Sequence, residues 1–227
     1  MKPFIMPGPC DIGVELIYSL VLVILCLLVY FKTKEIYELT SHKGIKYFRA
    51  AFMFFTIAYL FRFLAHIFMF YQINFGIHPR IMGLVGLLPF AFASSMAILS
   101  LAYSTLWKKL EFKKFNELYL LYFLAILITL TVFITRSALI FLATQALLFI
   151  IAIIMSYKNF KEKKKKSHFA SLYTTYGLLF LFWIFNLAVF ARIRYFHDTK
   201  PIFYFISALI FGFIAYKVIK TTKTKYT

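Results

Sequence analysis

Two ionisable residues, Arg62 and His66, interrupt an otherwise almost entirely apolar run from Tyr47 to Ile73. A helix over this run places both side chains on one face, a turn apart, and Tyr59 precedes them on the same stripe. Ionisable groups at membrane depth are costly, so they usually face the interior of a helix bundle and often mark a functional site. The charge of a histidine can change near neutral pH, so His66 would add pH sensitivity to such a site.

Other polar residues lie at a similar depth in other apolar runs. With a rise of about 1.5 Å per residue, Glu15 lies roughly 10 Å and Asn186 roughly 9 Å outward from the centres of their runs. Arg192 follows near the outer rim, and Gln145 lies closer to the midplane. The predicted ligand-binding set therefore comprises Glu15, Tyr59, Arg62, His66, Gln145, Asn186 and Arg192.

These residues allow two interpretations. In the first, Glu15 and Arg62 form a structural latch that fixes helix register, because an arginine fork suits a carboxylate and pairing lowers the cost of burial. His66 would then donate to a backbone carbonyl. In the second, the residues surround an outward-facing pocket, walled by Phe and Tyr, that accepts a small ligand or an anion. Such a pocket should reach roughly 300 Å³, and we expect at least three of Tyr59, Arg62, His66 and Asn186 to line it.

The sequence contains none of the common catalytic or metal-binding motifs. It has no His-Glu-x-x-His sequence, no paired acidic motif and no Gly-x-Ser-x-Gly elbow. The two cysteines, Cys10 and Cys26, have no metal-ligand neighbours, and the remaining histidines fall at the ends of apolar runs or between them. We therefore expect no enzymatic activity, no metal and no cofactor.

The composition indicates one polytopic membrane domain over residues 1–227. The chain is 63% hydrophobic and 21% aromatic, with a mean hydropathy of +0.82, and it leaves too few polar residues for a separate soluble domain. An all-α fold with seven transmembrane helices is predicted, because each apolar run is long enough to cross a bilayer. The expected spans are about 12–31, 47–73, 81–107, 117–135, 137–157, 168–191 and 201–219.

The net charge of +18 could suggest a nucleic-acid-binding protein. The Lys and Arg residues instead alternate between rich and poor segments along the chain, as expected for the two sides of a membrane. Segments on one side hold 19 Lys and Arg residues and segments on the other hold 6, which follows the positive-inside rule. The N-terminus is therefore expected outside and the C-terminus inside. The block Lys163–Lys166 would either bind anionic lipid headgroups or serve as a topology anchor.

The loop lengths suggest a repeat in which spans one to three and five to seven share order and orientation around a linking span. This arrangement is similar in topology to SWEET carriers, but no motif of such carriers is present. Microbial rhodopsins share the span count, yet they hold retinal on a lysine in the middle of the seventh span, and Lys217 lies at the inner end here. Gly83, Gly86 and Pro89 predict either close helix packing or a kink beside a cavity in span three.

The sequence thus predicts a small ligand-binding or sensory membrane protein with an outward-facing pocket. The alternative is a transporter for a small solute, anionic or zwitterionic in view of Arg62 and Arg192. The short basic tail leaves no room for a fused signalling domain, so a signal would pass to a separate cytoplasmic partner. The richness in Lys, Ile and Phe suggests an AT-rich microbial genome, and hence the plasma membrane of a prokaryote.

Overall fold

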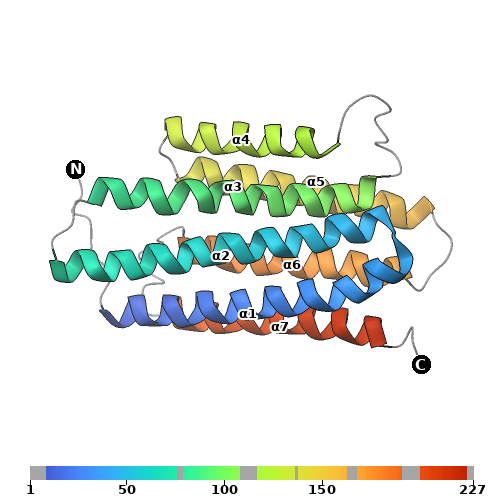
Figure 1. Ribbon diagram of the computed structural model, residues 1–227, viewed down its shortest axis with the longest axis horizontal. Helices are drawn as coiled ribbons and strands as arrows, with labels where there is room; N and C mark the ends of the chain where they lie inside the picture. The colour runs from blue at the N-terminus through green and yellow to red at the C-terminus, as the bar shows by residue number, and fades with distance from the viewer. Residues whose placement is uncertain are drawn as a thin grey trace.

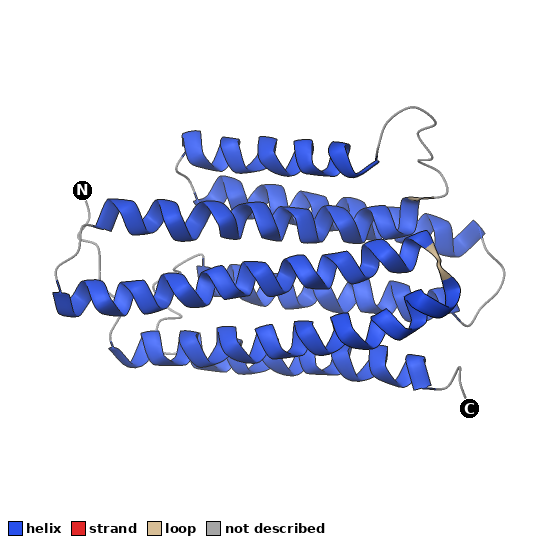
Figure 2. Ribbon diagram, viewed as in Figure 1, coloured by secondary structure: helices blue, strands red, loops and turns tan. Residues whose placement is uncertain are grey.

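The computed structural model describes residues 9–75, 79–107, 117–135, 138–162, 168–190 and 200–223. Within these ranges the chain is helical apart from Ser41, His42 and Trp107, and it contains no strand (Figure 2). The seven helices are α1 (Pro9–Thr40), α2 (Lys43–Phe75), α3 (Pro79–Leu106), α4 (Glu117–Thr135), α5 (Ala138–Glu162), α6 (His168–Phe190) and α7 (Lys200–Lys223). The predicted all-α fold is therefore confirmed.

Five of the helices are long and apolar enough to cross a membrane, namely α1, α2, α3, α4 and α7. The described side chains of α5 and α6 contribute shorter apolar stretches, Ile140–Ile154 and Thr174–Asn186. Large apolar side chains also cover the outside of the bundle, and Ile134 and Phe205, for example, are 76% and 66% exposed. Such a surface suits hydrocarbon and would be a liability in water, so the fold is that of a membrane protein.

The helices form a ring of six with one helix outside it. Along the ring α1 packs on α2, α2 on α3, α3 on α5, α5 on α6, α6 on α7, and α7 closes on α1. Figure 1 shows α1, α2 and α3 nearer the viewer and α5, α6 and α7 behind them. Helix α4 lies beyond α3 and α5, and contacts only these two helices strongly.

The C-terminal end of α1 extends beyond the apolar part of the helix. Helix α1 continues to Thr40, well past the span predicted to end near residue 31. Two exposed ion pairs at helical spacing, Lys32–Glu35 and Lys34–Glu38, support this polar extension. The connection to α2 is made by Ser41, whose φ of 47° is left-handed, and its amide donates to the Tyr37 carbonyl at 2.8 Å.

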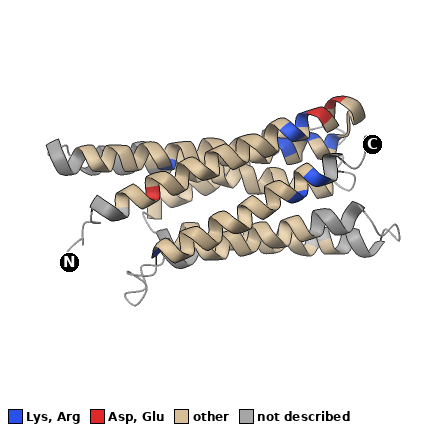
Figure 3. Cartoon of the chain, turned by 90° about the horizontal axis from the view of Figure 1, so that it is seen from below, with Lys and Arg blue, Asp and Glu red and all other residues tan. Residues whose placement is uncertain are grey.

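Most of the described Lys and Arg residues gather at one end of the bundle, the end near which the chain terminates (Figure 3). The opposite end carries few described charges. The described part of the bundle therefore has one basic end, and the rest of it carries few charges. The block Lys163–Lys166 lies outside the described residues.

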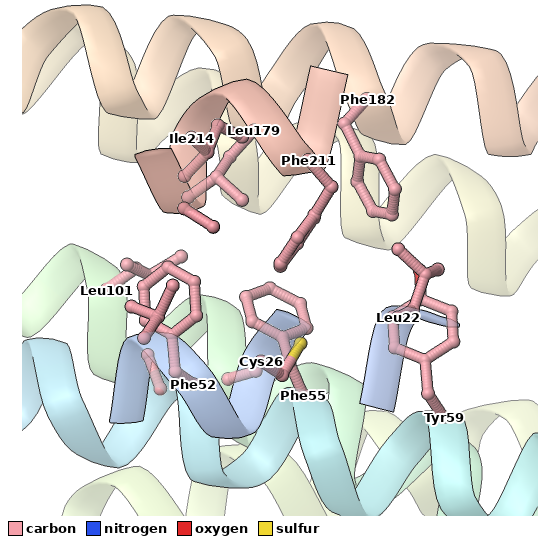
Figure 4. Packing of buried hydrophobic residues seen from close by; sticks show 14 of the residues in the cluster. Leu22, Cys26, Phe52, Phe55, Tyr59, Leu101, Leu179, Phe182, Phe211 and Ile214 are labelled. Carbon is pink, nitrogen blue, oxygen red and sulfur yellow. The ribbon is translucent and has the colours of Figure 1, made fainter. Parts of the chain in front are cut away.

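Close helix packing and aromatic side chains build the core. At the α2–α3 contact, a Cβ added to Gly86 would come within 2.8 Å of the Cβ of Ala65, so these helices approach closely because position 86 is glycine. In the centre of the ring Cys26 is buried among apolar side chains from several helices. The members shown in Figure 4 include Leu22, Cys26, Phe52, Phe55, Leu101, Leu179, Phe182, Phe211 and Ile214.

Candidate functional site

Four helices bring polar side chains together at one level of the bundle. Helix α1 supplies Glu15 and Tyr18, and α2 supplies Arg62 and His66, in each case three or four residues apart and therefore on one helix face. Helix α6 adds an amide and α7 adds a phenol and a hydroxyl. We call these seven residues the polar cluster: Glu15, Tyr18, Arg62, His66, Asn186, Tyr204 and Ser207.

Glu15 is held from two helices. Its Oε2 contacts Nε2 of His66, and its Oε1 accepts a hydrogen bond from the Tyr204 hydroxyl at 2.8 Å. The other ring nitrogen of His66, Nδ1, lies 2.7 Å from the carbonyl oxygen of Arg62. Because a carbonyl can only accept, Nδ1 is the donor there. Nε2 is therefore the ring nitrogen that faces the carboxylate of Glu15.

Arg62 lies on the same α2 stripe and is buried, with 6% of its surface exposed. Its guanidinium donates to the Tyr204 hydroxyl at 3.2 Å and to Oδ1 of Asn186 at 3.4 Å. The guanidinium carbon also lies 5.5 Å from the ring centre of Tyr18 and 5.7 Å from that of Tyr204. Both distances are within the range of cation–π attraction, which partly offsets the cost of removing the charge from water.

The predicted latch takes a different form in the structure. Glu15 pairs with His66, and Arg62 is joined to the same carboxylate through the Tyr204 hydroxyl, which accepts from Arg62 and donates to Glu15. The expected hydrogen bond from His66 to a backbone carbonyl is present, to Arg62. A network of contacts from three helices therefore holds α1, α2 and α7 together.

Asn186 connects this network to a second set of hydroxyls. Its Oδ1 accepts from Tyr18 at 2.8 Å, and its Nδ2 donates to Ser207 at 2.9 Å and to the carbonyl of Phe182 at 3.0 Å. Tyr18 and Ser207 are also hydrogen-bonded to each other at 2.8 Å. Tyr18, Tyr204 and Ser207 were missed by the sequence analysis. Their signal was helical spacing, since Tyr18 follows Glu15 by three residues and Ser207 follows Tyr204 by three.

A separate polar group lies on α3 and α5. Gln145 is 1% exposed, and its Nε2 donates to the Ser95 hydroxyl at 2.9 Å and to the Ser94 hydroxyl at 3.4 Å. Ser94 in turn donates to the carbonyl of Ala91 at 3.1 Å. The side-chain amide therefore joins the two helices at a depth where few polar partners are available.

A cavity of about 40 Å³ separates the two polar groups. One wall carries Tyr59, Arg62 and Asn186, and the other carries Ser94 and Gln145. Helices α2, α3, α5 and α6 supply its walls, which are otherwise mainly aromatic: Phe55, Phe90, Phe141, Phe149, Phe182 and Trp183. Figure 4 shows three of the lining side chains, Phe55, Tyr59 and Phe182, at their place beside the core.

This cavity matches the expected pocket in lining but not in size. Three of the four expected residues line it, while His66 lies with Glu15 in the polar cluster. Its volume is far below the roughly 300 Å³ typical of small-molecule sites. A water needs about 10–15 Å³, so the cavity accepts only a molecule of a few atoms in this conformation. Arg192, the remaining predicted site residue, lies outside the described residues.

A second cavity, of about 430 Å³, lies between α3 and α4 beside Pro89. Its described lining is apolar apart from Thr129, whose hydroxyl donates to the carbonyl of Ala125 within its own helix. No polar group is therefore placed to orient a ligand there, as binding sites normally require. Among the described residues, no group of three His, Cys, Asp or Glu side chains is placed to hold a metal ion.

The chain is similar to an uncharacterized protein of Archaeoglobus fulgidus, with 29% identity over 217 residues that cover 92% of each chain. No protein-family model matches the chain, and no solved structure does. The similarity extends over nearly the whole length of both proteins.

Proposed function

We propose that the protein binds a small ligand inside its helix bundle and acts as a sensory or ligand-binding component of a prokaryotic plasma membrane. The observation that carries this proposal is the cavity between Arg62 and Gln145, where polar side chains from four helices face one buried space. Buried polar groups within a membrane are expensive and usually functional. Because the cavity is small, the ligand either has few atoms or enters as the helices separate.

In this proposal all seven helices cross the membrane, with the N-terminus outside and the C-terminus inside. The basic end of the bundle in Figure 3 supports this orientation, since cytoplasmic segments are enriched in Lys and Arg. Anionic headgroups would lie against that end, including the block Lys163–Lys166. A ligand-induced change would be read there by a separate cytoplasmic partner.

A small-solute transporter is the second candidate, and the arrangement of the ring favours it. Helices α1–α3 and α5–α7 form two facing groups, and α4 lies outside them, as a three-plus-one-plus-three repeat would require. The cavity is lined by α2 and α3 from one group and by α5 and α6 from the other. Substrate sites of repeat-built transporters lie at such an interface near the midplane.

Thermal unfolding of the purified protein in detergent, against a panel of small solutes, tests the binding proposal. A solute present at a hundred times its Kd should stabilise the protein by about 2.7 kcal/mol. Ser94→Val, which narrows the cavity, should abolish this effect, whereas Thr105→Val, elsewhere on α3, should preserve it. If no solute stabilises the protein, the proposal is wrong. Uptake of the same solute into proteoliposomes would then separate a transporter from a sensor, because only a transporter moves it across the bilayer.

A further inference from the structure

A polar atom of Gln145 in the wall of the cavity has unused hydrogen-bonding capacity. Oε1 of Gln145 is buried and has no hydrogen-bond partner among the described residues. Buried acceptors in native proteins are nearly always paired, with the protein itself, with water or with a ligand. An unpaired acceptor in the wall of a cavity therefore indicates that the missing partner occupies the cavity.

The neighbouring serines fix which end of the Gln145 amide carries the unpaired atom. Ser94 donates its hydroxyl hydrogen to the carbonyl of Ala91, so its oxygen is left to accept from the amide nitrogen of Gln145. The same nitrogen also donates to the hydroxyl of Ser95. Both hydrogens of the Gln145 amide nitrogen are therefore used. The amide consequently presents an acceptor to the cavity, and its partner must bring an N–H or O–H group.

The opposite wall limits the charge of that partner. Arg62 lines the same cavity and carries a positive charge, which repels a cation and attracts a carbonyl oxygen. An anion would meet the unpaired oxygen of Gln145 at the other wall, where like partial charges repel. A volume of about 40 Å³ leaves room for only about three to four non-hydrogen atoms, at about 10–15 Å³ for each water-sized group.

We propose that the cavity binds a small neutral molecule that carries both a hydrogen-bond donor and a carbonyl oxygen, of the amide or undissociated carboxylic acid class. The donor pairs with Oε1 of Gln145 and the carbonyl oxygen faces Arg62. This inference rests on the proposed ligand-binding function and names the chemistry of its ligand. The aromatic side chains, with Trp183 among them, enclose the remaining surface of the molecule.

Trp183 provides a direct reporter of occupancy. The chain has two tryptophans, so Trp107→Phe leaves Trp183 as the sole source of indole fluorescence. Four probes of about the same size separate the ligand classes at pH 8: acetamide is neutral with a donor, dimethyl sulfoxide is neutral without one, acetate is an anion and guanidinium is a cation. Acetamide should change the Trp183 emission saturably, with a Kd at least tenfold lower than that of each other probe.

Two variants at neighbouring positions of α5 test the role of Gln145. Gln145→Met keeps the length of the side chain and removes the unpaired oxygen, so the preference for acetamide over dimethyl sulfoxide should disappear. Thr144→Val removes a hydroxyl that bonds within α5, to Ile140, and should leave the preference intact. The comparison of the four probes on the Trp107→Phe protein needs no change at the site, so it remains decisive even where Gln145→Met fails to fold.

The other outcomes overturn the inference in distinguishable ways. Equal binding of dimethyl sulfoxide and acetamide would mean that no donor is required, and tighter binding of acetate or guanidinium would mean that the site selects charge. In both cases the proposed ligand-binding function survives and the ligand class is wrong. If no probe alters Trp183 emission while a larger solute stabilises the protein, the class is again wrong. If no solute of any kind binds, both proposals fail.

Discussion

His66 and Glu15 face each other across the contact between α1 and α2, with the imidazole Nε2 against a carboxylate oxygen. The second ring nitrogen donates to the carbonyl of Arg62 one turn earlier, which fixes the orientation of the ring. The same carboxylate accepts from Tyr204 of α7. Glu15 is thus the point at which three helices meet, and its charge compensates that of the buried guanidinium nearby.

The charge of Glu15 should therefore stabilise the fold strongly. Glu15→Gln leaves Arg62 without its compensating carboxylate and should cost about 3–5 kcal/mol, the range for broken buried pairs. Glu35→Gln is the matched control, because it breaks an exposed ion pair with Lys32 on the same helix and should cost less than about 1 kcal/mol. The free energy of unfolding in detergent measures both. Equal losses of unfolding free energy in the two variants would show that Glu15 contributes no more to stability than a surface ion pair does.

The Tyr204 hydroxyl should account for the link between Glu15 and Arg62. Tyr204→Phe keeps the ring that stacks on Tyr18, with centroids 4.5 Å apart, and removes only the hydroxyl. Loss of hydrogen bonds to charged groups predicts a cost of about 1.5–3 kcal/mol. Tyr216→Phe, at an exposed position of the same helix, should change stability by less than about 0.5 kcal/mol.

A double-mutant cycle checks that the hydroxyl and the carboxylate act together. Residues in one hydrogen-bond network show coupling of about 0.5–3 kcal/mol, so Glu15→Gln combined with Tyr204→Phe should cost less than the two single losses added. Strict additivity would mean that Tyr204 stabilises the bundle without acting on Glu15, and the three-helix network would then be only two independent contacts.

The contact between α2 and α3 should tolerate no added carbon at position 86. Gly86→Ala puts a Cβ within 2.8 Å of Ala65, and relief requires the helices to move apart. Overpacking of this kind costs about 1–3 kcal/mol. Gly212→Ala is the control, because a Cβ there meets nothing within 4 Å, and it should stabilise α7 by up to about 1 kcal/mol. A neutral Gly86→Ala would mean that the helices do not approach this closely.

The sequence predicted the helices better than the contacts between them. Apolar runs of membrane length define where helices form, because an unpaired backbone in hydrocarbon is prohibitive. The depth of Arg62, His66, Glu15 and Asn186 was likewise readable from helical rise, and all four lie in the described polar cluster. Periodicity within one helix does not reveal which neighbour it faces, so the pairing of Glu15 with His66 could not be derived.

The parts of the site that escaped prediction depend on packing between distant segments. In the sequence, Tyr204 and Ser207 are ordinary residues of an apolar run. They come close to Tyr18 only because α7 packs against α1 and closes the ring. The volume of the cavity was also beyond the sequence, since it depends on how the rings of Phe141, Phe149 and similar residues fill the space between four helices.

Cysteine labelling tests the proposed topology. In a Cys10→Ser background, with Cys26 buried and therefore unreactive, single cysteines at positions 78 and 197 should react with an impermeant reagent in sealed cells. Cysteines at positions 113 and 164 should react only after the cells are opened, because the positive-inside rule places those segments in the cytoplasm. Labelling at position 164 in sealed cells would reverse the orientation.

The central claim, that the buried space between Arg62 and Gln145 binds a small neutral molecule with a hydrogen-bond donor and a carbonyl oxygen, is tested most directly by a structure of the protein determined with and without acetamide. The difference density should show a molecule of acetamide in this cavity, with its amide nitrogen within about 3 Å of Oε1 of Gln145 and its oxygen toward Arg62. Density for water alone, or acetamide bound only elsewhere on the bundle, would contradict the claim.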